Sequence, residues 1–261
     1  MTWTDWQTFD HYGYALVAVI GTAAAVAGVQ WILQGSRWAA WARSLHGVAP
    51  PFINIIGVLF GLTLAFLAND TWSAHDRAMN AVFREADALH SLVVLSGQLP
   101  EPSRGQLRAA VSGYAHASVG EWPLLARRQA SPEVTARADA LLMLLASRDV
   151  AAHTSHNVQA LMLREVSTLR DQHDQRIGLS QTHVNPLKWL GMAFLGFLTL
   201  LSVAVVHVDK PRTALVAIVL FALAAAPTAA IVLVQGNPFQ QPTSVSPSPI
   251  RAAVDAPQLP Q

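Results

Sequence analysis

The chain has 261 residues, of which 52% are hydrophobic and only 13% charged, about half the charged fraction of a typical soluble domain. The net charge of +1 gives no basis for a nucleic-acid partner or another polyanion. Because the sequence contains no cysteine, disulfides and thiolate metal sites are excluded as supports of the fold.

Four apolar stretches are long enough to cross a bilayer, which takes about 20 residues, with a range of about 17 to 25. They lie at about residues 14–33, 52–68, 187–208 and 213–234. The first is not a cleaved signal peptide, because the segment before it carries Asp5 and Asp10 but no Lys or Arg. Aromatic residues typical of interfacial anchors flank this stretch: Trp3, Trp6, Tyr12, Tyr14, Trp31, Trp38 and Trp41.

The second apolar stretch continues into a charged segment without a helix breaker. From Phe52 to Leu89 there is no proline, and both glycines, Gly57 and Gly61, lie in the first half. The sequence therefore predicts one helix that leaves the hydrocarbon near Asn69 and continues in water.

Small or polar residues follow steps of three or four along the apolar half of this helix. They form one face: Asn54, Gly57, Gly61, Ala65 and Ala68, extended by Trp72 and Asp76. Such a face is either a close packing seam, centred on Gly57, Gly61 and Ala65, or a pore wall.

In a pore, Asn54 and Thr63 would be polar points, and Phe60, Leu62 or Phe66 an apolar constriction. Phe60 and Leu62 do not share the small face, so only one face can be the lumen. Asn69, Asp70 and Thr71 mark the water boundary or form an ion-attracting ring at a pore mouth. The pore-lining candidates are Asn54, Gly57, Phe60, Gly61, Phe66 and Asp70.

Residues 69–186 are polar and have helical periodicity. After the long helix, a second is predicted over about 103–120, with a bend or pause at Glu121-Trp122-Pro123. A third begins at Ser131-Pro132-Glu133, which reads as an N-cap with Pro at the first helical position, and a fourth covers about 149–179. Glu85 and Asp87 are interpreted as surface charges or salt links within this bundle.

The predicted fold class is therefore an all-α integral membrane protein with four transmembrane helices and a helical bundle inserted between helices 2 and 3. The predicted divisions are 1–68, with the first two membrane helices; 69–186, the bundle; 187–235, the last two membrane helices; and 236–261, a tail rich in Pro, Ser and Gln. The composition of the tail predicts an extended or disordered segment.

Lys and Arg in the short loops predict the orientation. Arg37 and Arg43 lie in the first short loop, and Lys210 and Arg212 in the second, while the tail has only Arg251. The positive-inside rule puts both short loops in the cytoplasm. The bundle and both termini would then lie outside it, in the periplasm of a Gram-negative cell.

The sequence contains ten histidines, but they do not form a recognisable catalytic or metal-binding pattern. His153 and His156 are three residues apart, with Asp149 and Glu165 nearby, yet there is no His-Glu-x-x-His motif. Phosphate-binding loops, nucleophile elbows and kinase motifs are also absent from the sequence. We therefore expect no catalytic residues, no metal site and no cofactor.

Several motifs in this order resemble the bestrophin-like domain family of bacterial membrane proteins. They are GVLFGLTLAFLANDTW, READAL, EWP after a Tyr, and NPFQQPTSVSPSPI after the last span. The resemblance covers about residues 52–250. Members of that family typically carry Gly after the Pro-Phe pair, where this chain has Gln240.

The resemblance implies a multi-pass protein of the bacterial inner (plasma) membrane. Bestrophins are pentameric anion channels in which a helical domain sits between spans two and three and the second helix lines the pore. Their domain and termini face the cytoplasm, opposite to the orientation that the loop charges predict here. The partners implied are the lipid bilayer, further copies of the chain and an inorganic ion.

Two functions follow. One is an oligomeric channel lined by the second helix; the other is a non-conducting membrane scaffold or sensor whose bundle binds a protein partner.

Overall fold

The structure is a computed structural model that describes residues 10–35, 44, 49–181, 186–234 and 236–255. Within these residues the fold is all-helical, without strands. The chain divides into two compact units. The first comprises Met1–Ser73 with His183–Gly236, and the second comprises Ala74–Thr182 with Asn237–Gln261.

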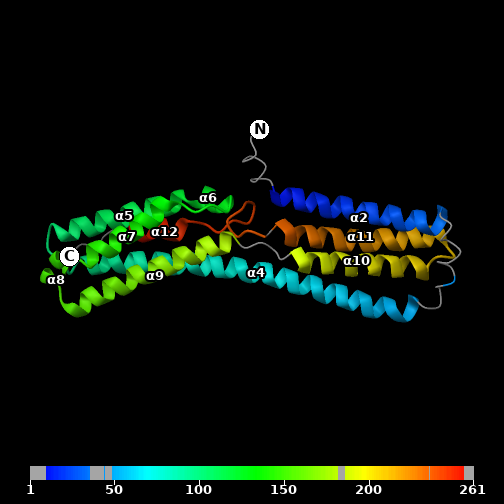
Figure 1. The fold of residues 1–261 in the computed structure, drawn as a ribbon, viewed down its shortest axis with the longest axis horizontal. Helices are drawn as coiled ribbons and strands as arrows, with labels where there is room; N and C mark the ends of the chain where they lie inside the picture. The colour runs from blue at the N-terminus through cyan, green and yellow to red at the C-terminus, as the bar shows by residue number, and fades with distance from the viewer. Residues whose placement is uncertain (1–9, 36–43, 45–48, 182–185, 235, 256–261) are drawn as a thin grey trace, which may run out of the picture. The chain divides into compact units, whose positions relative to one another are not determined.

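The first unit is built from apolar helices. Helices α2 (Asp10–Gly35), α10 (Pro186–Val206) and α11 (Pro211–Val234) pack side by side (Figure 1). Val29 of α2 is buried with Leu200 and Ala204 of α10 and Ile218 of α11. A second apolar cluster joins the first half of α4 (Ala49–Ser96) to α10 and α11: Phe60, Leu67, Ala68, Met192, Ala229 and Val232.

Three helices are long and apolar enough to cross a membrane, among the residues that the structure describes: α4, α10 and α11. In α2, the apolar part with described side chains is the shorter Ala18–Ile32. The predicted loop arginines Arg37 and Arg43 lie outside the described residues.

Helix α4 is a single uninterrupted helix of 48 residues, about 72 Å long at 1.5 Å per residue. It stays helical through residues 66–74, where the apolar part of the sequence gives way to the charged part. The helix ends at Gly97, whose N–H donates to the Val94 carbonyl at 3.1 Å. In the turn that follows, Arg104 donates from Nε to the Leu99 carbonyl and from Nη2 to the Gly97 carbonyl.

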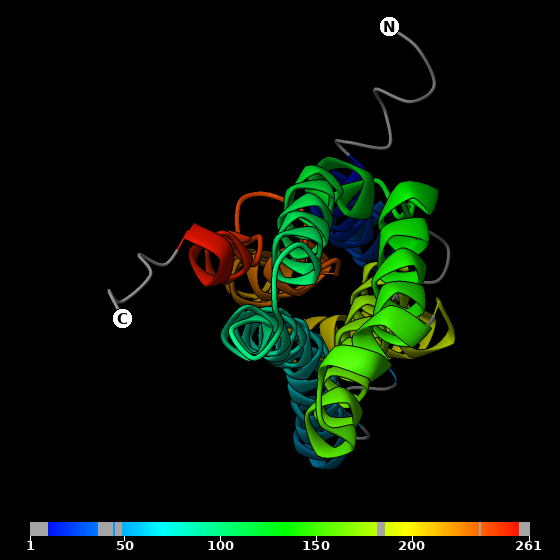
Figure 2. The ribbon, with the colours of Figure 1, turned by 90° about the vertical axis from the view of Figure 1, so that its left-hand side faces the viewer.

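The second unit is a helical bundle around one apolar core (Figure 2). Its helices are α5 (Ser103–Gly120), α6 (Trp122–Ala126), α7 (Pro132–Leu145), α8 (Arg148–His153), α9 (His156–Ser180), α12 (Ser248–Asp255) and the second half of α4. The predicted N-cap position of α7 is correct, because Ser131 is extended and Pro132 begins the helix. However, the Ser131 side chain makes no capping hydrogen bond.

The prediction of a single helix over about 149–179 is wrong. Thr154 is extended, with φ −135° and ψ 160°, and separates α8 from α9. The Ser155 hydroxyl accepts a hydrogen bond from the Val158 N–H at 3.3 Å and starts α9 as its N-cap. The helical periodicity over these residues looks continuous, but a capping serine within it divides the segment into two helices.

The prediction that the tail is extended or disordered is wrong for residues 236–255. Residues 237–255, here called the C-terminal strap, pack on the bundle and end in α12, which lies along α5 (Figure 1). The buried strap side chains belong to the bundle core: Phe239, Val245, Ile250 and Ala253. The composition argument failed because these apolar residues are spaced among Pro, Ser and Gln and become buried only against α5 and α6.

Candidate functional site

The predicted pore-lining residues of α4 fall on two sides of the helix. Phe60 is buried, while Asn54, Gly61, Phe66 and Asp70 are exposed and Gly57 is half-buried. Phe66 is 67% exposed, the largest exposure among the large apolar side chains of this helix's described part. The structure thus separates Phe60 from the other candidates instead of gathering all six on one surface.

Phe60 packs against other helices of the same chain. Its ring centroid lies 5.6 Å from that of Phe221 on α11. A Cβ atom added to Gly196 on α10 would lie 3.0 Å from the Phe60 ring. Gly196 therefore leaves the space that the ring fills, and Phe60 anchors α4 to α10 and α11.

Asp70 pairs with Lys188 at the start of α10. The Lys188 Nζ donates to Asp70 Oδ2 at 2.6 Å, and both side chains are about half exposed. Thr63 and Thr71 each donate a side-chain hydrogen bond to the carbonyl four residues earlier in α4. These polar groups near the apolar half of the helix are therefore satisfied within the first unit.

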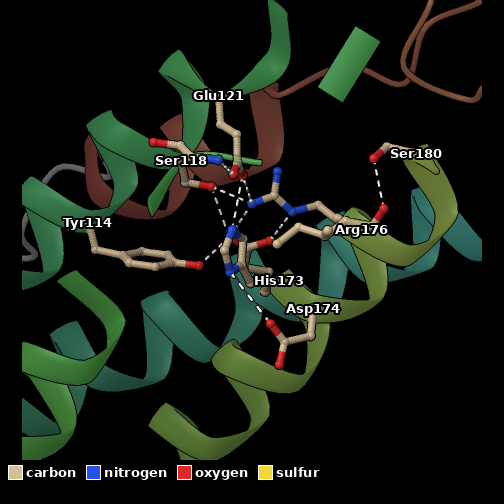
Figure 3. Close-up of polar contacts among 10 residues, drawn as sticks. Tyr114, Ser118, Glu121, His173, Asp174, Arg176 and Ser180 are labelled. Atoms are coloured by element: carbon tan, nitrogen blue, oxygen red, sulfur yellow. Dashed lines mark hydrogen bonds and ion pairs between the residues drawn. The ribbon is translucent and has the colours of Figure 1, made fainter. Parts of the chain in front are cut away.

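The second unit contains a group of polar side chains buried from solvent, here called the buried polar cluster. Its members come from α4, α5, the α5–α6 junction and α9: Glu85, Tyr114, Ser118, Glu121, His173 and Arg176. Figure 3 labels all of them except Glu85. Neither this cluster nor any other part of the described chain brings together three or more His, Asp or Glu side chains that could hold a metal ion.

Arg176 is the centre of the cluster and is fully buried. Its Nε lies 2.6 Å from Glu85 Oε2. Its Nη2 donates to Ser118 Oγ at 2.8 Å and to Glu121 Oε2 at 3.5 Å. One guanidinium thus connects α4, α5 and the α5–α6 junction to α9.

The two carboxylates are supplied with further donors. Tyr114 and Ser118 donate to Glu85 Oε1 at 2.8 Å and 2.9 Å. The Ser131 N–H donates to Glu121 Oε1 at 2.7 Å, and His173 Nε2 lies 3.0 Å from Glu121 Oε2. Because an ionised carboxylate only accepts hydrogen bonds, His173 Nε2 carries the hydrogen.

Burial and these contacts shift two pKa values. Burial alone would raise the pKa of Glu121, but the hydrogen bonds from His173 and Ser131, with the charges of His173 and Arg176, lower it below its ordinary value. Burial, together with the negative charge of Glu85, raises the pKa of Tyr114 well above its ordinary value. The cluster therefore holds Glu121 ionised and Tyr114 neutral at neutral pH.

Trp122 joins the buried polar cluster to the C-terminal strap. The Arg176 guanidinium carbon lies 4.8 Å from the centroid of the Trp122 ring, a cation–π contact. The indole Nε1 donates to the Val245 carbonyl at 2.7 Å. The Phe239 ring meets the Trp122 ring edge-on, with centroids 5.7 Å apart.

Asn237 fixes the start of the strap. Its side-chain Nδ2 donates to the Leu125 carbonyl at 3.0 Å, at the end of α6. Its Oδ1 accepts from the Phe239 N–H at 2.9 Å, and its carbonyl accepts from the Gln240 N–H at 3.1 Å. The turn after Pro-Phe therefore forms with Gln240 at the position where the family typically has glycine.

Sequence reasoning did not identify this cluster. Glu85 was interpreted as a surface charge or a bundle salt link, and the structure places it at the fully buried ion pair with Arg176. Glu121 and Trp122 were recognised only as a pause between helices. The available signal was a charge at core positions of amphipathic helices: Arg176 lies seven residues after Leu169, in the stripe of α9 that faces the core.

The Bestrophin-like domain family matches residues 20–250 of the chain. No curated protein is detectably similar to it in sequence. The fold is similar to crystal structures of single-residue variants of a bacterial bestrophin homologue from Klebsiella pneumoniae. One matches with a TM-score of 0.63 and 15% identity over 94% of this chain and 93% of the other. Another matches with a TM-score of 0.61 and 16% identity over 92% and 94%.

Proposed function

The chain belongs to the bestrophin-like domain family, and from this premise we propose that it is an oligomeric ion channel of a bacterial inner membrane whose α4 helices line the pore. The apolar helices and the family membership identify a membrane protein. The observation that carries the channel proposal is the exposure of α4. Only 11% of the most apolar segment of α4 is buried within the chain, whereas the corresponding segments of α10 and α11 are 28% and 22% buried.

An apolar helix that its own protomer leaves uncovered contacts lipid, a neighbouring subunit or a lumen. Four of the large side chains left exposed on the apolar half of α4 lie along one stripe at steps of three and four: Ile55, Leu59, Leu62 and Phe66. Rings of such side chains from several subunits form the apolar constriction that gates channels by dewetting. We assign Leu62 and Phe66 to this constriction and not Phe60, which packs on Phe221.

The small face of α4 supplies the contact between neighbouring subunits. Asn54, Gly61 and Ala65 are exposed within one protomer, and small residues allow helix backbones to approach closely in lipid. The same face continues beyond the membrane segment with exposed Trp72, 58% accessible, and Phe83, 55% accessible. Exposed aromatic side chains in water favour a partner, and continuity with the membrane face favours a second copy of the chain.

Single-channel recording tests the proposal. Purified protein in planar bilayers should give unitary currents whose size or gating changes in Phe66→Ala. Phe194→Ala is the matched control, because Phe194 is 59% exposed but lies on α10; it should leave the currents unchanged. Silence of the wild type across salts and voltages would contradict the channel and favour the scaffold, in which the bundle binds a protein partner.

The loop charges support an orientation with the bundle and both termini outside the cytoplasm. Lys210 is exposed in the loop between α10 and α11, and Arg212 is exposed in the first turn of α11; both are therefore accessible at the end that the charge rule assigns to the cytoplasm. We retain this orientation as part of the proposal, although it is opposite to that of bestrophins.

A further inference from the structure

The C-terminal strap and the buried polar cluster share one side chain. The Trp122 ring contacts the Arg176 guanidinium and lies perpendicular to the Phe239 ring, and its Nε1 donates to the Val245 carbonyl. Arg176 in turn is paired with Glu85 of α4. The strap thus contacts the guanidinium's stacking partner, more than a hundred residues away in sequence.

The ion pair between Glu85 and Arg176 depends on exclusion of water. Both side chains have zero exposed surface, and a buried charge is tolerated only while its partners are in place. If the strap undocked, the Trp122 ring would lose its contact with Phe239, and its Nε1 would lose the Val245 carbonyl. Water would then reach the ring that covers Arg176.

We propose that the C-terminal strap is a latch on the bundle: its undocking and the breaking of the Glu85–Arg176 pair are one coupled event. The strap contacts Trp122, the Trp122 ring stacks on Arg176, and the ion pair of Arg176 with Glu85 connects α9 to α4. The latch is a conformational device of the bundle and does not depend on whether the protein conducts ions.

The latch can be measured because the chain contains no cysteine, so a single introduced thiol reports local opening. Ala253→Cys reports the strap, since Ala253 is 8% exposed on α12, and Ala115→Cys reports the cluster side of α5, where Ala115 is 2% exposed. Ala138→Cys, on α7 with 1% exposure, reports opening of the whole bundle. The rate of labelling under native conditions reflects the population of each open form.

Glu85→Gln should accelerate labelling of Ala253→Cys on the order of 100-fold, because it removes one partner of a buried charge pair. Tyr114→Phe, a milder change that removes only the hydrogen bond to Glu85, should accelerate it about 5- to 10-fold. In both variants, labelling of Ala138→Cys should remain slower than labelling of Ala253→Cys, because opening of the whole bundle costs more free energy than opening of the strap. Glu133→Gln, at an exposed pair with Arg137, is the matched control and should change none of the rates.

The reverse direction must give the same coupling, because linkage between two sites is reciprocal. Phe239→Ala, which removes the ring that meets Trp122, should accelerate labelling of Ala115→Cys. Met143→Ala, at a side chain 72% exposed, should not. An unchanged Ala253→Cys rate in both Glu85→Gln and Tyr114→Phe would overturn the latch. Labelling of Ala253→Cys that is no faster than labelling of Ala138→Cys would also overturn it, because the strap would then open only together with the whole bundle.

Discussion

Replacement of Arg176 by methionine should destabilise the bundle by about 3–5 kcal/mol, the usual cost of removing one partner of a buried ion pair. Methionine keeps much of the apolar volume but leaves Glu85 and Glu121, 0% and 1% exposed, without the guanidinium. Against a typical domain stability of about 5–15 kcal/mol, the loss is large. The cause is the stranded negative charge, and the lost contact with Trp122 is a smaller part.

Hydrogen exchange followed by mass spectrometry measures this effect in the full chain in detergent. Peptides from α5 and α9 should exchange roughly 100- to 1000-fold faster in Arg176→Met, because protection reports the free energy of opening. The double variant Glu85→Gln/Arg176→Met should recover about 2 kcal/mol, since it also removes one stranded carboxylate. Arg137→Met, at an exposed pair, is the control and should change the exchange little.

Two results would refute this reasoning. One is an Arg176→Met variant whose stability lies within about 1 kcal/mol of the wild type, below the range expected for a buried pair. The other is a double variant whose loss equals the sum of the two single losses, because the two charges would then be independent.

Four further predictions concern pH, packing and orientation. The lowered pKa of Glu121 contributes stability that is complete above the unfolded value of about 4.3 and is lost on acidification, so the melting temperature should fall below that pH. The raised pKa of Tyr114 predicts a second loss as pH rises above about 10. Gly196→Leu should destabilise the detergent-solubilised protein by about 1–3 kcal/mol, because a Cβ there already lies 3.0 Å from Phe60. A reporter that works only outside the cytoplasm should be active when it is fused after Gln261. A reporter that works only in the cytoplasm should be inactive at the same position.

The last three of these predictions have a control or a contradicting outcome. Tyr114→Phe should abolish the alkaline loss, and a loss that persists would assign it to another group. Gly191→Leu is the matched packing control, because nothing lies within 4 Å of a Cβ at Gly191; equal destabilisation by both variants would contradict the role of Phe60. A reporter active only in the cytoplasm would reverse the orientation drawn from Lys210 and Arg212.

Local features of the fold were predictable because local chemistry decides them. The absence of proline after Phe52 predicted the unbroken α4, and Ser131-Pro132 predicted the start of α7. The family resemblance also followed from the order of the motifs and is confirmed over residues 20–250. What failed locally was the α8–α9 break, because the capping role of Ser155 depends on Thr154 leaving the helix.

The buried polar cluster could not be predicted, because its members meet only through long-range packing. Arg176 and Glu85 are separated by 91 residues, and Trp122 and Val245 by 123. Periodicity identifies a helix face but not the charge that another helix brings to it. The prediction for the strap failed for the same reason. Its Pro, Ser and Gln content describes the behaviour of an isolated segment, whereas Asn237 and Phe239 are buried by α6.

The proposed pore remains a prediction, and its most direct test is the structure of the assembled protein in lipid. Electron cryo-microscopy of the protein in nanodiscs should show several copies of α4 around one axis, with a hole at the level of Phe66 and with Phe60 turned toward α11. A single copy, or an assembly in which the apolar half of α4 is covered by protein on every side and no central opening exists, would contradict the account.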